Sequence, residues 1–473
     1  MNFKISAKFL SSFFVFLIFI TAGCTPDPGL RWNEQDGYRW AELPGRFFDN
    51  TGFRLIEGTD SGISFANQVE DETIRENRHY ANGSGVAIGD VTGDGLPDIY
   101  FASLEGSNKL YENLGNLQFR DITDEAGVAH SETSSTGVLM LDVNGNGHND
   151  LLITSLDGSN ALYLNNGDGT FTLKENSGLG ESNGSHSMAA ADINGNGFPD
   201  LYIANYRLES VRDRYGPEDL SMENTTVTEN GQMRIRSEFE DYYEIIEVDG
   251  EQLRREKGAE DQLFLNNGDG TFQQADPLQH FPVNIAGDSG LFEDWGFTPA
   301  FRDLTGDGNP DLYVTNDFWS PDRLWINRGD GIFHPADQEA ITNQSYSSMG
   351  VDMTDLNKDG LPDIMITEML SGEHERRVRQ FSDYMGRYQG STHHNRNSLY
   401  LNRGDTTFAQ IARFSGLEAS EWSWATLFMD VDLDGHEDLL VATGFYRDYL
   451  DMDAQQEIAR RYEEMGDEML NRG

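Results

Sequence analysis

The clearest copy of a repeated pattern lies in residues 85–101, which read GVAIGDVTGDGLPDIYF. Two short apolar stretches there flank a loop of the form Asp-x-[Asn/Asp/Thr]-x-[Asn/Asp]-Gly-x-x-Asp. Most copies follow one another after about fifty residues, a period typical of propellers, solenoids and repeat arrays. The loop occurs at six places, which begin at Asp90, Asp142, Asp192, Asp303, Asp355 and Asp430.

A second pattern follows the loops. Residues 160–171 read NALYLNNGDGTF, and similar runs lie at 262–272, 323–333 and 398–408, with a weaker one at 109–119. Apolar alternation interrupted by Asn-Gly or Asp-Gly is a strong signal for a β-hairpin. Each repeat therefore predicts about four short strands, as in the blade of a β-propeller. A solenoid of parallel strands fits such tight hairpins less well.

We therefore expect an all-β protein: a β-propeller of six or seven four-stranded blades, with calcium-binding loops, over residues 52–449. Phe53–Ile56, with Gly62–Phe65 after it, resembles the outer strand and turn of a blade whose other strands come later in the chain. After the sixth loop, one strand at 438–442 precedes a helical, charged tail at 450–473. Either six blades close the ring with the N-terminal strand, or the chain stops before a seventh blade.

The repeated loops carry the ligands that calcium prefers. Positions 1, 3, 5 and 9 hold carboxylates, amides or hydroxyls, and the glycine at position 6 permits the sharp bend. Calcium binds about 6–8 oxygens in a flexible geometry. The alternative is that the loops are only Asx-type turns, above all the second and third copies, which have the fewest acids. The predicted calcium ligands are Asp90, Thr92, Asp94, Asp98, Asp142, Asn144, Asn146, Asp150, Asp192, Asn194, Asn196, Asp200, Asp303, Thr305, Asp307, Asp311, Asp355, Asn357, Asp359, Asp363, Asp430, Asp432, Asp434 and Asp438.

The composition excludes several classes of protein. The 473 residues include 81 acidic and 34 basic side chains, which gives a net charge of −47. Such a charge repels phosphate backbones, so we expect no nucleic acid among the partners. A single cysteine excludes a disulfide framework and a cysteine-based zinc site. The 11% of aromatic residues and the ordered repeats argue against a disordered acidic chain.

The first residues predict a targeting segment. Lys4 and Lys8 precede an apolar run that is too short for a membrane span, as in a signal peptide at 1–23. The run ends in Thr21-Ala22-Gly23-Cys24, which resembles the lipobox of bacterial lipoproteins. The resemblance implies that Cys24 is lipidated and that residues 24–51 form a tether to a bacterial membrane. Thr25 at the next position favours the outer membrane. An uncleaved signal anchor is the alternative.

Several segments carry a further resemblance: residues 85–90 (GVAIGD), the Asn-x-Leu-Tyr-x-Asn-x-Gly hairpins, Asn316-Asp317, residues 348–352 (SMGVD) and residues 420–424 (SEWSW). They resemble the FG-GAP/VCBS propeller repeats of integrin α-subunits and bacterial surface proteins. The resemblance is closer to the bacterial cartilage-acidic-protein-like family, which carries an ASPIC and UnbV-type region. Such proteins usually continue into further repeats and that region. We therefore expect a short member of the family or a fragment.

The first functional hypothesis is a non-enzymatic binding or adhesion module on the cell surface. The resemblance implies a protein or a glycan as the ligand. Insertions at about 207–260 and 369–396 should project from one face of the propeller as loops or small subdomains. An assembly factor or partner subunit for another surface protein fits the same features. We expect the tripeptides Arg328-Gly329-Asp330 and Arg403-Gly404-Asp405 to be hairpin turns rather than recognition motifs.

The second functional hypothesis is a calcium-dependent polysaccharide lyase or hydrolase. Basic residues in the second insertion would bind an anionic glycan, although a solvated charged segment is the simpler interpretation. For the first hypothesis, four tryptophans are placed to contact a ligand or to pack within and between blades: Trp295, Trp319, Trp422 and Trp424. The candidate residues of the enzyme hypothesis are His374, Arg376, Arg377, His393 and His394.

Overall fold

The computed structural model describes most of the chain from residue 53 to residue 445. The predicted signal peptide at 1–23, Cys24, most of the tether at 24–51 and most of the tail at 450–473 lie outside the described residues. The described ranges are 33–35, 38–40, 53–216, 218–248, 250–283, 290–318, 320–337, 340–380, 394–445, 453–454, 456–457 and 460–461.

The chain divides into two units, Met1–Glu57 and Gly58–Gly473. The first unit contains one antiparallel pair, β1 (Asn33–Gln35) and β2 (Tyr38–Trp40). The second unit contains the repeats. None of the helices in the described ranges has the length and apolar character that a membrane crossing requires.

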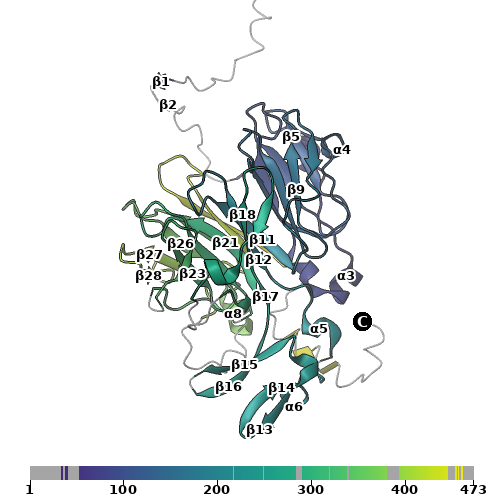
Figure 1. Ribbon diagram of the computed structural model, residues 1–473, viewed down its shortest axis with the longest axis vertical. Helices are drawn as coiled ribbons and strands as arrows, with labels where there is room; N and C mark the ends of the chain where they lie inside the picture. Colours follow the sequence, from purple (N-terminus) through teal and green to yellow (C-terminus); the bar gives the residue numbers. More distant parts are fainter. Residues whose placement is uncertain are drawn as a thin grey trace, which may run out of the picture. The chain divides into compact units, whose positions relative to one another are not determined.

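The expectation of an all-β protein is confirmed, because the described part of the second unit contains five four-stranded antiparallel sheets and four two-stranded ones (Figure 1). Sheet 1 consists of β3 (Val86–Gly89), β4 (Asp98–Phe101), β5 (Lys109–Asn113) and β6 (Phe119–Asp121). Sheet 2 consists of β7 (Ser135–Leu141), β8 (Asp150–Ser155), β9 (Ala161–Asn165) and β10 (Phe171–Leu173). Sheet 3 consists of β11 (Ser185–Ala191), β12 (Asp200–Asn205), β18 (Gln262–Asn266) and β19 (Phe272–Gln274). Sheet 4 consists of β21 (Gly296–Arg302), β22 (Asp311–Asn316), β23 (Arg323–Asn327) and β24 (Phe333–Pro335). Sheet 5 consists of β25 (Val351–Thr354), β26 (Asp363–Ile366), β27 (Ser398–Asn402) and β28 (Phe408–Gln410), and sheet 6 of β29 (Ser423–Met429) and β30 (Asp438–Thr443).

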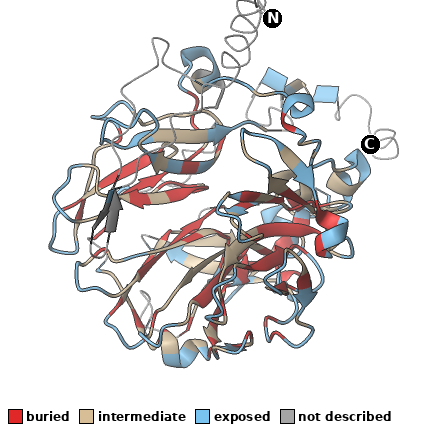
Figure 2. Cartoon of the chain, turned by 90° about the horizontal axis from the view of Figure 1, so that it is seen from above, coloured by how far each residue is buried: buried red, intermediate tan, exposed pale blue. Residues whose placement is uncertain are grey.

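Successive sheets pack face to face. The first strand of each sheet lies beside the first strand of the next, in the order β3, β7, β11, β21, β25 and β29. Each joint encloses its own apolar core; Tyr100 and Leu110 of sheet 1, for example, cluster with Leu151 and Tyr163 of sheet 2. Buried residues gather where the sheets face one another (Figure 2). Alternation along each strand therefore supplies apolar residues to both faces of an inner sheet.

The stretch between β12 and β18 forms a small subdomain with a core of its own, which includes Val211, Phe239, Tyr242 and Tyr243. Its two hairpins, β13–β14 and β15–β16, lie at one end of the second unit, away from the five sheets (Figure 1). The elements of this stretch are α5 (Val211–Arg214), α6 (Met222–Thr225), β13 (Thr226–Glu229), β14 (Gln232–Ile235), η2 (Ser237–Phe239), β15 (Tyr243–Val248), β16 (Glu251–Glu256) and β17 (Ala259–Glu260), which pairs with β20 (Glu293–Asp294).

Short helices precede sheet 1, lie between sheets or interrupt sheet 5 between its second and third strands. They are α2 (Gly58–Ser61), α3 (Asp71–Glu76), η1 (Arg78–Asn82), α4 (Thr123–Ala126), α7 (Pro277–His280) and α8 (His374–Gln380).

The interpretation of Phe53–Ile56 as a strand is wrong for this structure. These residues have no regular secondary structure, and Phe53 and Leu55 are exposed. The physical reason is that a strand needs a hydrogen-bonded neighbour, and the structure pairs none with this segment in its described part.

Candidate metal centre

The six repeated loops connect the first strand of each sheet to the second. In every loop the aspartate at position 1 accepts hydrogen bonds from backbone amides within its own loop. Its Oδ2 accepts from the glycine at position 6 at 2.7–2.8 Å, as in Asp90 with Gly95 and Asp430 with Gly435. The carboxylate therefore holds the bend closed, and the left-handed glycine makes that bend possible, with φ +86° at Gly95.

The aspartate at position 9 has a second structural task, which the sequence did not reveal. In sheets 1 to 5 it is fully buried, and its Oδ2 accepts the backbone amide of position 2, as from Val91 to Asp98 at 3.0 Å. Its Oδ1 accepts the backbone amide of an asparagine at the end of the third strand, at 2.8–2.9 Å. The carboxylate thus connects the loop with the second and third strands. Burial raises the pKa of Asp200 and Asp311 to about 6.

The side chain of that asparagine joins neighbouring sheets. Its Nδ2 donates to the position-2 carbonyl of the preceding loop at 2.8–2.9 Å. Adjacent loops are therefore held together, since one amide contacts both. The pairs are Asn165 with Val91, Asn266 with Val143, Asn327 with Ile193, and Asn402 with Leu304.

The donor set of the loops fits a calcium ion. In the sixth loop, Asp430, Asp432 and Asp434 each offer a carboxylate oxygen, and these oxygens lie within 4.8 Å of one another. In the first loop, the hydroxyl of Thr92 is buried and has no hydrogen-bond partner among the described residues. Carboxylate, amide and hydroxyl oxygens within one turn are the hard ligands that calcium takes. The assignment of the 24 loop residues to calcium stays a prediction.

A cluster of buried aromatic and ionisable side chains lies where the first and second strands of sheets 3 and 4 meet η1 and the subdomain. Tyr206 is central: its ring centroid lies 4.9 Å from those of His79 and Trp295, and its hydroxyl donates to Asp317 at 2.7 Å. Burial lowers the pKa of His79 and of His186 to about 4. Both imidazoles are therefore neutral at pH 7. No periodic pattern surrounds His79 or His186, so sequence reasoning missed them.

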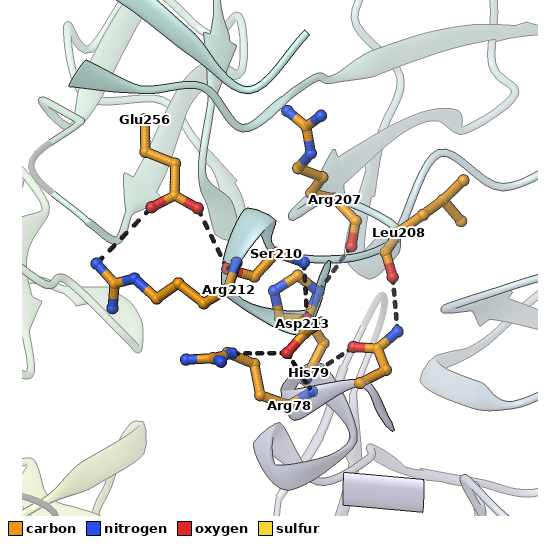
Figure 3. A network of polar contacts seen from close by, with 9 residues as sticks. Arg78, His79, Arg207, Leu208, Ser210, Arg212, Asp213 and Glu256 are labelled. Atoms are coloured by element: carbon orange, nitrogen blue, oxygen red, sulfur yellow. Dashed lines mark hydrogen bonds and ion pairs between the residues drawn. The ribbon is translucent and has the colours of Figure 1, made fainter. Parts of the chain in front are cut away.

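A polar network fixes η1, which carries His79, to the subdomain (Figure 3). Arg78 Nε donates to Asp213 Oδ1 at 2.8 Å, and Asp213 Oδ2 accepts the amide of Ser210 at 2.9 Å. Nδ1 of His79 donates to the carbonyl of Arg207 at 3.0 Å, which requires the Nδ1-protonated tautomer. Glu256 completes the network through the Ser210 hydroxyl at 3.2 Å. The cluster is therefore covered by chain rather than open to a ligand.

The candidate residues of the second insertion are brought only partly together. Arg376 pairs with Glu373 and with Glu421, each at 3.5 Å. Arg377 pairs with Glu418 at 3.2 Å. These arginines thus face carboxylates of the protein itself, as in the simpler interpretation of this segment. His374 lies at the start of α8. His394 forms an isolated parallel β-bridge with Ser345 through the backbone, and His393 lies outside the described residues.

The four predicted tryptophans also differ in their surroundings. Trp295 is fully buried, and Trp422 and Trp424 are half-buried, each in a stack with Phe445 at 4.1 and 5.4 Å between ring centroids. Trp319 lies outside the described residues. The two tripeptides Arg-Gly-Asp lie in the turns that follow β23 and β27, with φ of +94° at Gly329 and +77° at Gly404.

A family model described as FG-GAP-like repeat matches residues 90–153, 142–203, 303–366 and 384–441. The first three matches begin at the first aspartate of a loop and end in the second strand of the next sheet, so they follow the observed repeat. The chain belongs to the FG-GAP repeat family. The suspected membership is thereby confirmed.

Relatives of this FG-GAP repeat protein include cartilage acidic protein 1 of Mus musculus, Xenopus tropicalis and Homo sapiens, at 33%, 31% and 32% identity over 85 residues. The match covers 18% of this chain and 13% of the length of these curated relatives. Among solved structures, the V. cholerae biofilm matrix protein Bap1 is similar with a TM-score of 0.33 and 12% identity, over 77% of this chain and 66% of that chain. BBS1N, from its complex with ARL6DN, has a TM-score of 0.32 and 9% identity, over 78% of this chain and 91% of that chain.

Proposed function

We propose that the protein is a calcium-rigidified FG-GAP β-propeller that acts as a binding or adhesion module for a protein or a glycan at the cell surface. In this proposal Cys24 is lipidated and tethers the propeller to a bacterial membrane. The favoured membrane is the outer membrane. The observation that carries the proposal is that each of the six loops holds several acidic side chains within one turn and that the same backbone bend recurs in all six.

Calcium has a physical role in this arrangement. The sixth loop brings three carboxylates within 4.8 Å of one another, and like charges at such a distance repel. A bound cation removes that repulsion and supplies the attraction that orders the loop. Each loop joins two strands, and the first four loops also contact the next loop through an asparagine, so ordered loops stiffen the joints between sheets.

The subdomain between β12 and β18 is the surface proposed to bind the ligand. It has its own core, so it presents its hairpins on a defined scaffold. The hairpin β13–β14 carries exposed charged side chains, among them Arg234 and Glu229. A rigid propeller that positions such a hairpin is suited to contact another macromolecule.

The test begins with the soluble chain from residue 25 onward, melted with calcium and with excess chelator. We expect a large rise in melting temperature with calcium, because a ligand that binds only the folded state stabilises it by mass action. Acidic and neutral polysaccharides and purified surface proteins are then screened for binding in calcium buffer. The absence of both a calcium-dependent shift and bound calcium would refute the proposed role of the loops.

A matched pair of variants then locates the ligand. Arg234→Glu reverses a charge on β13–β14. Arg413→Glu reverses a charge that is also well exposed and also pairs with a glutamate but lies outside the subdomain. We expect Arg234→Glu to weaken binding and Arg413→Glu to leave it unchanged. Equal effects would remove the subdomain from the proposal.

The alternative function is a calcium-dependent polysaccharide lyase or hydrolase that uses the inserted loops. Its arginines Arg376 and Arg377 already pair with glutamates, so the described residues offer it no specific support. Depolymerisation of an acidic polysaccharide by the purified protein would favour it over a binding module.

A further inference from the structure

The short helix η1 is bound to the segment that opens the subdomain (Figure 3). Three consecutive side chains, at positions 77 to 79, donate hydrogen bonds to residues that lie 128–135 positions later in the chain. We call these three contacts the clasp. It connects the chain just before sheet 1 with the subdomain inserted in sheet 3. The pairs are Asn77 with the Leu208 carbonyl at 2.7 Å, Arg78 with Asp213 at 2.8 Å, and His79 with the Arg207 carbonyl at 3.0 Å.

His79 can hold only one ring proton in the closed clasp. Its Nδ1–H donates to Arg207, so its Nε2 is the basic nitrogen of a neutral ring. That Nε2 is buried and has no hydrogen-bond partner in the described part of the chain. The rings of Tyr206 and Trp295 lie T-shaped to the imidazole, at 4.9 and 5.8 Å between centroids. A proton on Nε2 would therefore lie among aromatic rings without an acceptor, which is costly.

The charged groups that face His79 do not supply this acceptor. The guanidinium groups of Arg78 and Arg207 disfavour a positive imidazole. Asp213 favours one, but its Oδ1 already accepts from Arg78 and its Oδ2 from the Ser210 amide. Burial outweighs this carboxylate and lowers the pKa of His79 to about 4. The ring is therefore neutral at pH 7 while the clasp is closed.

His186, in β11, is a second neutral imidazole beside the same tyrosine. Its ring centroid lies 3.9 Å from that of Phe297 and 5.9 Å from that of Tyr206. A backbone group of Phe297 favours the charged form of His186, and His79 disfavours it. Neither ring nitrogen has a hydrogen-bond partner among the residues that the structure describes. Burial lowers the pKa of His186 to about 4, so this ring is neutral as well.

The acids of the cluster are arranged around Tyr206 and the subdomain. Tyr206 donates to Asp317 at 2.7 Å, which joins the ends of β12 and β22 without η1. Burial raises the pKa of Asp317, and Arg212 opposes this rise. Glu368 faces Asp317, and Glu256 pairs with Arg212 at 3.7 Å. Protonation of a buried carboxyl leaves it neutral, so acid strains this cluster at the two histidines.

We propose that the clasp is an acid-sensitive switch, which holds η1 on the subdomain while His79 and His186 are neutral and opens when they are protonated. In the open state water solvates the charged imidazoles, which the closed clasp cannot do. Opening separates η1 from residues 207–213 and leaves the bond between Tyr206 and Asp317 in place. The clasp is a property of the chain itself, so its opening is measured without a ligand.

The direction of the switch follows from proton binding. A histidine in water has a pKa of about 6.5, and burial lowers the pKa of both histidines in the closed clasp. The open clasp therefore binds more protons as the pH falls from about 6.5 to about 4, and acid favours it. Between pH 7.5 and pH 5, the ratio of open to closed clasp should rise about 30-fold for each histidine that opening exposes.

Hydrogen exchange of backbone amides measures this ratio in the soluble chain from residue 25. The reporting amides are those of Tyr80, which donates to Asn77, and of Asp213, which donates to Ser210. Each rate is divided by the intrinsic exchange rate at the same pH, in calcium buffer. We expect this quotient to rise about 30-fold or more from pH 7.5 to pH 5, while the amides of β8 keep theirs. No rise, or an equal rise in β8, would overturn the proposal.

Two substitutions remove the titrating rings. His79→Asn keeps a donor for the Arg207 carbonyl, and His186→Phe keeps an aromatic ring beside Phe297, but neither new side chain titrates. In the double variant we expect the quotient to change by less than about threefold. If the double variant does not fold, His79→Asn alone should lower the acid response by about 30-fold. A variant that responds to acid as the parent does would place the trigger on other groups and overturn the proposal.

His130→Gln is the matched control. Burial lowers the pKa of His130 as well, but both of its ring nitrogens contact hydroxyls, those of Tyr163 and Thr133, each at 3.0 Å. His130 also lies outside the clasp, in the turn between sheets 1 and 2. We expect this variant to keep the parent's acid response at Tyr80 and Asp213. Loss of the response in His130→Gln would show that the clasp histidines are not the trigger.

Discussion

The side-chain Nδ2 of Asn165, at the end of the third strand of sheet 2, donates a hydrogen bond to the carbonyl oxygen of Val91 in the loop of sheet 1, at 2.9 Å. The same nitrogen donates to Asn149 of its own loop at 3.0 Å. The bond to Val91 is buried and the bond to Asn149 is partly buried, so one amide satisfies two carbonyls that belong to different sheets. The joints between sheets are thus held by polar contacts at the loops as well as by apolar packing.

Asn165→Ala should therefore destabilise the fold by about 2–3 kcal/mol, because it leaves one buried and one partly buried carbonyl without this donor. The measurement is chemical denaturation of the soluble chain. Asn113→Ala is the matched control: Asn113 occupies the same place in sheet 1, and its one side-chain donation that the structure records goes to Pro97. We expect about 1 kcal/mol for the control. Equal losses would mean that the bond between sheets contributes little.

The sequence predicted the strands, the hairpins and the loops, because these depend on local patterns: alternation, Asn-Gly turns and a fixed spacing of acids. It did not predict the role of Asn165, whose partner Val91 lies 74 residues away. The asparagine of the Asn-x-Gly hairpin has a sufficient local explanation as a turn residue. Its amide oxygen does accept the amide of Gly167, at 2.8 Å, so the turn function and the joint function coexist.

The buried cluster around Tyr206 could not be predicted from the sequence, for a different reason. His79 and His186 come from separate segments, and only the packing of η1 against the first strands brings them to one place. The segment Phe53–Ile56 shows the opposite case. Its sequence resembles a strand, but a strand forms only beside a neighbour, and the pattern alone does not say whether one is present.

Asp322 predicts a pH dependence of stability. Its Oδ1 accepts the amide of Asn316 at 2.9 Å, and its Oδ2 accepts the hydroxyls of Tyr313 and Ser348 at 2.8 and 2.9 Å. Burial raises the pKa of Asp322 to about 7. An unfolded aspartate has a pKa of about 3.9, so between about pH 4 and pH 7 the folded state holds a proton that the unfolded state has lost. This carboxyl therefore lowers stability as the pH rises through that window, with no further change above it.

Asp322→Asn removes this loss. We expect the stability of the variant relative to the parent to rise by about 2–4 kcal/mol from pH 4 to pH 7. The reverse change, Asn108→Asp, is the matched control, because Asn108 takes the same place in sheet 1: it accepts from Ser103 and donates to the hydroxyls of Tyr100 and Ser135. It should introduce a loss over the same range. Parallel stability curves for parent and Asp322→Asn would contradict the argument.

Asp434→Ala should reduce the stabilisation by calcium. Asp434 is one of three carboxylates that meet in the sixth loop, and its loss removes a charged ligand. A site at about hundredfold excess of calcium over its dissociation constant adds about 3 kcal/mol, and the variant should lose most of that share. Melts with and without chelator provide the measurement. Asp269→Ala, in an exposed hairpin turn outside the loops, should keep the full calcium response. An unchanged response in Asp434→Ala would count against a site in this loop.

Gly178→Ala tests the contact between the turn of one sheet and the outer strand of the next. Gly178 has φ +86°, and a Cβ there would lie 1.9 Å from the carbonyl oxygen of Phe272, so the substitution must displace backbone. Gly180 has φ +68° with open space around its Cβ, so Gly180→Ala carries the backbone strain alone. We expect about 1–2 kcal/mol for Gly180→Ala and a clearly larger loss for Gly178→Ala, measured by chemical denaturation. If the two variants unfold at the same denaturant concentration, the turn does not contact sheet 3 as closely as the structure has it.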